Sequence, residues 1–143
     1  MTQDPYNLIR FLEAQKNIYP IALKELEEGY KRSHWMWYIF PQLMNLGHSY
    51  NAKFYGISGL EEALAYLQEP TLGARLRKVS ETILTLPTDD AHEVFGGIDS
   101  LKLQSSMTLF DLVSPDDVFT LVLDKYFKGQ RDNNTANIIQ FLK

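Results

Sequence analysis

The chain has 143 residues, of which 45% are hydrophobic and 22% charged, the usual make-up and size of one globular domain. Its net charge of −4 argues against broad binding to nucleic-acid backbones, and its lack of cysteine excludes disulfides and thiolate chemistry. The first residues carry no basic and apolar leader, and no apolar run approaches the ~20 residues that cross a bilayer. We therefore expect a single domain over residues 1–143, cytoplasmic and without a membrane partner.

Helix start and stop signals recur along the chain. Asp4 followed by Pro5 is a typical helix start, because proline lacks an N–H that the first helical turn would leave unpaired. Gly29 is a typical helix end, and residues 58–61 resemble a capping box. The helices predicted in the first half therefore span 5–15, 20–28, 31–40 and 60–67.

The clearest amphipathic helix follows residue 70 and ends at Pro87. Its apolar side chains recur at steps of four, three, four and three, at Leu72, Leu76, Val79, Ile83 and Leu86. A stripe with this spacing lies on one face of a helix, so we expect it to pack into the core.

Further helix starts follow in the second half, with predicted caps at Thr88, Asp99, residues 114–117 and Asp132. Gly96 and Gly97 are expected to separate the first two of these helices, because glycine disfavours helix interiors. In the helix after residue 117, the side chains predicted to face inward are Val118, Leu121, Val122 and Tyr126. No two alternating segments meet at a hairpin turn. The predicted fold class is all-α, a compact domain of about seven or eight helices.

Residues 31–42 crowd two Trp, one Tyr and one Phe behind two cations and a histidine. On a helix this segment is apolar on most sides, which is typical of a core helix. A Trp is seldom buried completely, because its N–H needs a partner, so one ring is expected to line a cavity. We expect His34, Trp37 and Gln42 to face that cavity, with Lys31 adding positive charge.

Lys102 and Ser106 lie four residues apart, on one face of a mostly apolar helix. Because an unpaired buried polar group costs roughly 1–3 kcal/mol, we expect them to complete the cavity around an anionic ligand or ordered water. In the alternative interpretation each polar side chain finds its own backbone partner or reaches solvent. Serine and lysine can also form a nucleophile and base, but no oxyanion hole or strained turn accompanies them. The sequence does not decide whether the protein is an enzyme.

The three histidines lack the spacing of metal ligands. The glycines of residues 55–59 and 95–97 lack the spacing of dinucleotide- or phosphate-binding loops. We expect no metal and no cofactor.

Several runs of the sequence are similar to the signature of the domain-of-unknown-function family 1810. They are residues 29–37 with 40–42 and 46–49, then 67–76, 95–110 and 132–135. The resemblance implies a small all-helical domain of bacterial type with no assigned reaction. Members often carry a calpastatin-like label, which suits a disordered inhibitor and not a compact chain. Members commonly have His at the position of Glu69 and Gly at that of Asn45.

Three functions remain open. The first is the binding or processing of a small anionic, nucleotide-like ligand in an aromatic-lined pocket. The second is a helical protein-interaction module in which the aromatic side chains anchor a protein partner that the sequence does not specify. The third is a structural role without a pocket. A polar cavity favours the first, and an exposed apolar patch favours the second.

Overall fold

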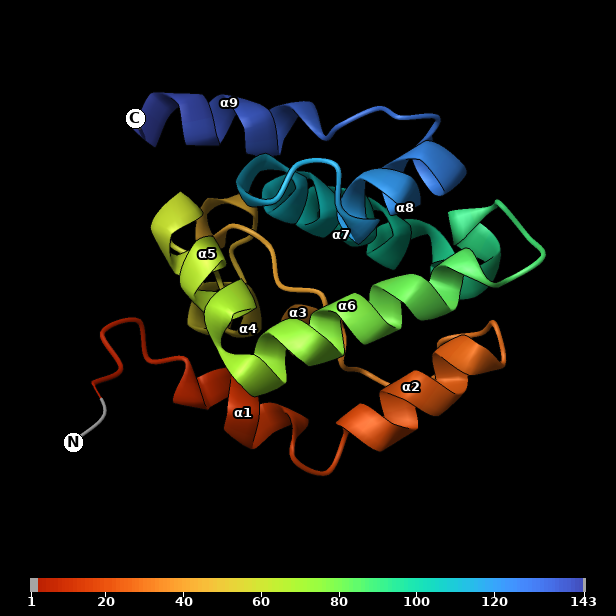
Figure 1. Ribbon diagram of the computed structural model, residues 1–143, viewed down its shortest axis with the longest axis horizontal. Helices are drawn as coiled ribbons and strands as arrows, with labels where there is room; N and C mark the ends of the chain where they lie inside the picture. The colour runs from red at the N-terminus through yellow and green to blue at the C-terminus, as the bar shows by residue number, and fades with distance from the viewer. Residues whose placement is uncertain (1–2, 143) are drawn as a thin grey trace.

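The computed structural model describes residues 3–142, with the side chains of all of these except residues 45, 141 and 142 (Figure 1). The described residues form helices and no named strand, apart from one isolated bridge between Leu43 and Ile57. The predicted all-α class is confirmed. The elements are α1 (Ile9–Gln15), α2 (Tyr19–Glu27), α3 (Met36–Ile39), the 3-10 turn η1 (Met44–Leu46), α4 (Tyr50–Phe54), α5 (Leu60–Gln68), α6 (Pro70–Leu84), α7 (Ala91–Val113), α8 (Val118–Phe127) and α9 (Asn133–Leu142).

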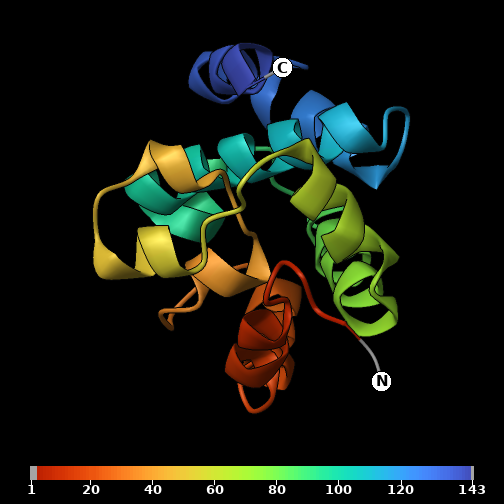
Figure 2. The ribbon, with the colours of Figure 1, turned by 90° about the vertical axis from the view of Figure 1, so that its left-hand side faces the viewer.

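The two longest helices, α6 and α7, organise the domain. Helix α6 contacts α1, α2, α5 and α8, whereas α7 contacts α5, α8 and α9. In both views α9 lies along one side of the molecule, and α1 and α2 lie along the opposite side (Figures 1 and 2). None of the described helices is long and apolar enough to cross a bilayer.

The predicted apolar stripe of α6 is buried along its whole length. Its members Leu72, Leu76, Val79, Ile83 and Leu86 all belong to the hydrophobic core. On α8 the prediction is correct for Val118, Val122 and Tyr126, but wrong for Leu121, which is exposed. The buried face of α8 also includes Phe119 and Leu123, and this shift turns Leu121 outward.

Three helix starts differ from those predicted. The capping box predicted at residues 58–61 is not formed, because the cap of α5 is Gly59 and no side-chain hydrogen bond caps the helix. Asp4 does accept hydrogen bonds from the N–H groups of Leu8 and Ile9, but α1 begins only at Ile9, after a turn in which Asn7 has a φ of 54°. The cap of α7 is Asp90, which accepts from the N–H of His92, and not Thr88. The hydroxyl of Thr88 accepts from Asp90 N–H instead, two residues before the true cap.

Helix α7 was expected as two helices with a cap at Asp99. The element spans Ala91 to Val113, but the non-helical backbone of Gly96 divides it into two helical stretches, so the predicted break is confirmed. The predicted cap is wrong, because Asp99 lies within the second stretch and not before it. The bend is at Gly96, whose φ of +81° is a conformation that side chains with a Cβ disfavour.

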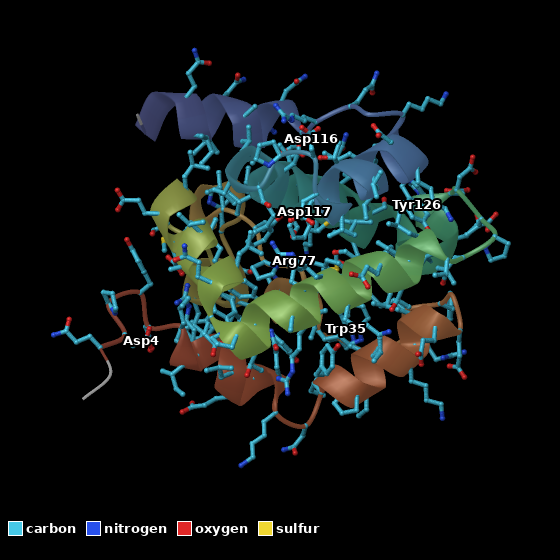
Figure 3. The ribbon with its side chains drawn as sticks, in the orientation of Figure 1. Asp4, Trp35, Arg77, Asp116, Asp117 and Tyr126 are labelled. Carbon is cyan, nitrogen blue, oxygen red and sulfur yellow. The ribbon has the colours of Figure 1, made fainter. Side chains whose placement is uncertain are left out.

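The aromatic segment 31–40 was expected to be helical, but only Met36–Ile39 forms a helical turn. The backbone N–H groups of Arg32 and Ser33 donate to the Glu25 carboxylate in α2, at 2.8 and 3.0 Å. Trp35 is fully buried and its indole N–H donates to the same carboxylate at 2.9 Å (Figure 3). A side chain from another helix thus holds residues 32–35 in a non-helical path before α3.

Candidate functional site

A groove of about 520 Å³ lies where residues 42–49, the middle of α7 and the start of α9 meet. Figure 2 shows these segments together: η1 in orange, α7 in teal and α9 in blue. η1 and α7 each contact α9. The lining side chains that carry chemistry are Trp37, Gln42, His48, Lys102, Ser105 and Asp132.

Gln42 is held in the groove by a short pairing of two loops. Its carbonyl accepts from the N–H of Ile57 at 2.9 Å, and Met44 N–H donates to the Ile57 carbonyl at 2.9 Å. Gly56 permits this approach, because a Cβ there would lie 2.3 Å from the Met44 Cα. Gln42 is only 9% exposed, and no hydrogen bond joins its side-chain amide to the part of the chain that the structure describes.

Two lysines share one carboxylate beside the groove. Lys31 Nζ lies 2.9 Å from Asp99 Oδ2, and Lys102 Nζ lies 3.5 Å from Asp99 Oδ1. The Lys102 ammonium also sits 4.2 Å from the centroid of the Trp37 ring, as in a cation–π contact. This cluster carries one more positive than negative charge, and Lys102 is its member that lines the groove.

Asp132 places a carboxylate at the α9 end of the groove, where it caps that helix as predicted. Its Oδ2 accepts from Thr135 N–H at 3.0 Å, from the Thr135 hydroxyl at 2.5 Å and from the Ser105 hydroxyl at 3.1 Å. The positive end of the α9 dipole and these donors offset its negative charge. Of the two charged side chains that line the groove, Lys102 is therefore the one whose charge is offset less by its neighbours.

The structure brings three of the six predicted site residues into this groove: Trp37, Gln42 and Lys102. Lys31 is joined to them through Asp99. His34 is exposed and is not among the lining residues, because its segment is not helical and turns away after Ser33.

Ser106, the sixth predicted residue, is fully buried and does not line the groove. Its hydroxyl has no hydrogen-bond partner within the described residues. Lys102 contacts Asp99 and Trp37, so the two side chains do not form a nucleophile and base pair.

The sequence-based site omitted His48, Ser49, Ser105, Asp132 and Asn134, which also line the groove. A signal for them was present, since residues 46–49, 99–110 and 132–135 are runs on which the family resemblance depends. Segments of a family signature that lie far apart in the chain, and that no packing role explains, are candidates for a common site.

Two other hollows, of about 470 and 500 Å³, are similar in size, but their buried polar groups are already paired. Glu62 in the first binds Arg10 and Ser58, and Lys125 in the second donates to the carbonyls of Leu84 and Leu86. Among the described residues, no three His, Asp or Glu side chains are grouped as they would be around a metal ion.

Comparisons with known proteins match almost the whole chain. A family model described as "Protein of unknown function (DUF1810)" matches residues 5–139. The crystal structure of the conserved hypothetical protein Rv1873 from Mycobacterium tuberculosis superimposes with a TM-score of 0.94 and 44% sequence identity. That match covers 96% of this chain and 99% of the other. A search among curated proteins found no match.

Proposed function

This chain belongs to the DUF1810 family, whose description assigns no activity, and we propose that it binds a small ligand with an anionic group in the groove. The observation that carries the proposal is the Lys102 ammonium, which lines the groove without a carboxylate of its own. Its nearest carboxylate, Asp99, lies closer to Lys31, at 2.9 Å against 3.5 Å.

The surroundings of Lys102 strengthen its attraction for an anion. Its side chain is 22% exposed, and a charge that is partly removed from water interacts more strongly than one on the open surface. The contact with Trp37 orients the ammonium but does not neutralise it, so its charge is offset only by the carboxylate that it shares with Lys31. A volume of about 520 Å³ falls within the range of roughly 300–1,000 Å³ typical of small-molecule sites.

Calorimetric titration with ribose 5-phosphate, a small phosphate monoester, tests the proposal. Replacing Lys102→Met removes the charge and keeps most of the side-chain volume. A hydrogen bond to a charged group contributes roughly 1.5–3 kcal/mol, so we expect binding to weaken by about 10- to 150-fold. Lys78→Met, an exposed position on α6 outside the groove, is the matched control and should bind as the wild type does.

Fluorescence gives an independent signal for the same titration. The chain has two Trp residues, of which Trp35 is fully buried and Trp37 lines the groove beside Lys102. Binding should change the emission of Trp37, and Trp37→Phe should remove that change. Equal affinities of the wild type and Lys102→Met would contradict the proposal.

The alternative function, a helical protein-interaction module, draws on two exposed apolar side chains at the edge of the groove. Ile98 and Leu101 lie three residues apart on α7 and are 74% and 63% exposed. Two such neighbours on one helix face are typical of contact surfaces between proteins. Failure of every phosphate compound to bind, together with a dimer in solution that Leu101→Ser dissociates, would favour this alternative.

A further inference from the structure

We propose that the ligand of this groove is a nucleotide, whose flat base is recognised by the Gln42 amide. This inference rests on the proposed function, because it identifies the chemical class of the anionic ligand. It is carried by a buried polar side chain that lines the groove and has no partner among the described residues.

The Gln42 amide places an N–H donor beside a C=O acceptor in one plane. A ligand with a complementary edge would pair with both groups at once, in a site largely removed from water, where hydrogen bonds are stronger. Nucleobases present adjacent donors and acceptors, and glutamine pairs in this two-bond manner with N6 and N7 of adenine. A phosphate or sugar alone offers no planar edge of this kind.

The position of Gln42 suits such recognition because its backbone is fixed on both sides. The Gln42 carbonyl accepts a hydrogen bond from Ile57 N–H, and Met44 N–H donates to the Ile57 carbonyl. Leu43, which lies between Gln42 and Met44, is buried. A side chain on a fixed backbone loses less conformational freedom when it binds, so more of the hydrogen-bond energy appears as affinity.

Trp37 supplies an aromatic surface in the same groove. Stacking of a base on an aromatic side chain contributes roughly 1–3 kcal/mol. The Lys102 ammonium lies 4.2 Å from the centroid of this ring, so the positive charge and the aromatic surface are neighbours. When a phosphate binds Lys102 and moves its ammonium away from Trp37, one face of the indole ring becomes free to stack on the base.

The remaining lining groups match the hydroxyls of a ribose. Ser49, Ser105 and Asn134 offer hydroxyl and amide groups, and Asp132 offers carboxylate oxygens. The groove thus contains a partner for each part of a nucleotide: a cation, an aromatic ring with an amide, and small polar groups.

The test compares 5′-mononucleotides with ribose 5-phosphate, which lacks only the base. We expect at least one of AMP, GMP, CMP and UMP to bind the wild-type protein at least tenfold more tightly than ribose 5-phosphate in calorimetric titrations. Gln42→Met, which keeps the length of the side chain and removes its amide, should weaken the binding of that nucleotide by about 5- to 150-fold, while stacking on Trp37 still favours it over ribose 5-phosphate. Binding of ribose 5-phosphate itself should not change.

Gln68→Met, an exposed position on α5 outside the groove, is the matched control and should keep the wild-type preference. Circular dichroism and thermal unfolding of each variant verify that it folds. Gln42→Glu provides a second, nearly isosteric change that should also weaken nucleotide binding.

Equal affinities of ribose 5-phosphate and all four nucleotides would overturn this inference and leave the proposed function standing. Equal weakening of both ligand types by Gln42→Met would also overturn it, and failure of both to bind would overturn the proposed function itself.

Discussion

At the scale of single residues, a buried carboxylate fixes the segment that leads into the groove. Glu25 accepts hydrogen bonds from Arg32 N–H, Ser33 N–H, the Ser33 hydroxyl and the Trp35 indole, all between 2.6 and 3.0 Å. Burial raises the pKa of its carboxyl, but the hydrogen bonds from Ser33, Arg32 and Trp35 outweigh burial and lower the pKa to about 2. Lys31, which binds Asp99 beside the groove, directly precedes the segment that Glu25 anchors.

Replacing Glu25→Gln should lower the free energy of unfolding at pH 7 by about 1.5–3 kcal/mol, because the acceptor of four hydrogen bonds loses its negative charge. The folded-state pKa is depressed, so the stabilisation is present above the ordinary value of 4.5 and is lost as pH falls toward 2. The difference in the free energy of unfolding between wild type and variant, measured by urea unfolding, should therefore become smaller as the pH is lowered from about 4.5 toward 2.

Glu27→Gln, an exposed position on the same helix, is the control and should change stability by no more than about 0.5 kcal/mol. Similar losses for both variants at pH 7, or a difference that does not depend on pH, would show that Glu25 is not the anchor.

At the scale of elements, the groove depends on a contact between two loops and not on a helix. Residues 42–44 and 57 exchange backbone hydrogen bonds across an isolated parallel bridge. Gly56 sits where the two loops touch, with the Met44 Cα and the Ala52 carbonyl close to the space that its Cβ would fill. Only glycine leaves room for this approach, which sets the position of Gln42.

Gly56→Ala should therefore destabilise the protein by about 1–3 kcal/mol, the usual cost of overpacking. Because the loops must move apart, the variant should also weaken nucleotide binding more than ribose 5-phosphate binding. Thermal unfolding and calorimetric titration measure the two effects.

The matched control is Gly97→Ala in α7, where the added Cβ would meet only the His92 ring at the ordinary distance of 3.7 Å. Alanine has a higher helix propensity than glycine, so this variant should be neutral or up to about 1 kcal/mol more stable. A Gly56→Ala protein as stable as Gly97→Ala would contradict the close approach of the two loops.

At the scale of the whole molecule, polar contacts between helices supplement the apolar core. Arg77 of α6 pairs with Asp117, the cap of α8, at 3.0 Å (Figure 3). At the C-terminal end of α6, the Tyr126 hydroxyl donates to the Ile83 carbonyl, and Lys125 donates to the carbonyls of Leu84 and Leu86. Burial, followed by the charge of Asp89, raises the pKa of Tyr126 to about 12, so its hydroxyl stays protonated and can donate.

A single domain over residues 1–143 should unfold in one cooperative step. Tryptophan fluorescence reports on residues 35 and 37 beside α2 and α7, whereas far-ultraviolet circular dichroism reports on all helices together. We expect the two thermal transitions to coincide, and the calorimetric and van't Hoff enthalpies to agree. A separate transition seen by circular dichroism alone would show that part of the chain folds independently.

Most of the helical architecture can be predicted from the sequence, because the signals for it are local. The stripe from Leu72 to Ile83 needs only the helical repeat of 3.6 residues to be assigned to one face of α6, whereas Leu86 is buried beyond the end of the helix. The ends at Gly29 and Asp132 follow from the conformation of one glycine and one capping carboxylate. The same local signals misplaced the caps at Thr88 and Asp99, because several capping residues stand close together in each place and the true starts lie at Asp90 and just after Gly96.

The path of residues 31–35 and the composition of the groove depend on tertiary contacts. Apolar density in the aromatic segment predicts a helix, but Glu25, from another helix, binds Arg32, Ser33 and the Trp35 indole and holds them in a non-helical path. Gln42, Lys102 and Asp132 are separated by at least 30 residues in the chain and come together through the Leu43–Ile57 bridge and the packing of α7 against α9. Hydrogen bonds and contacts between distant residues have no periodicity along the chain, so the pattern of the sequence cannot specify them.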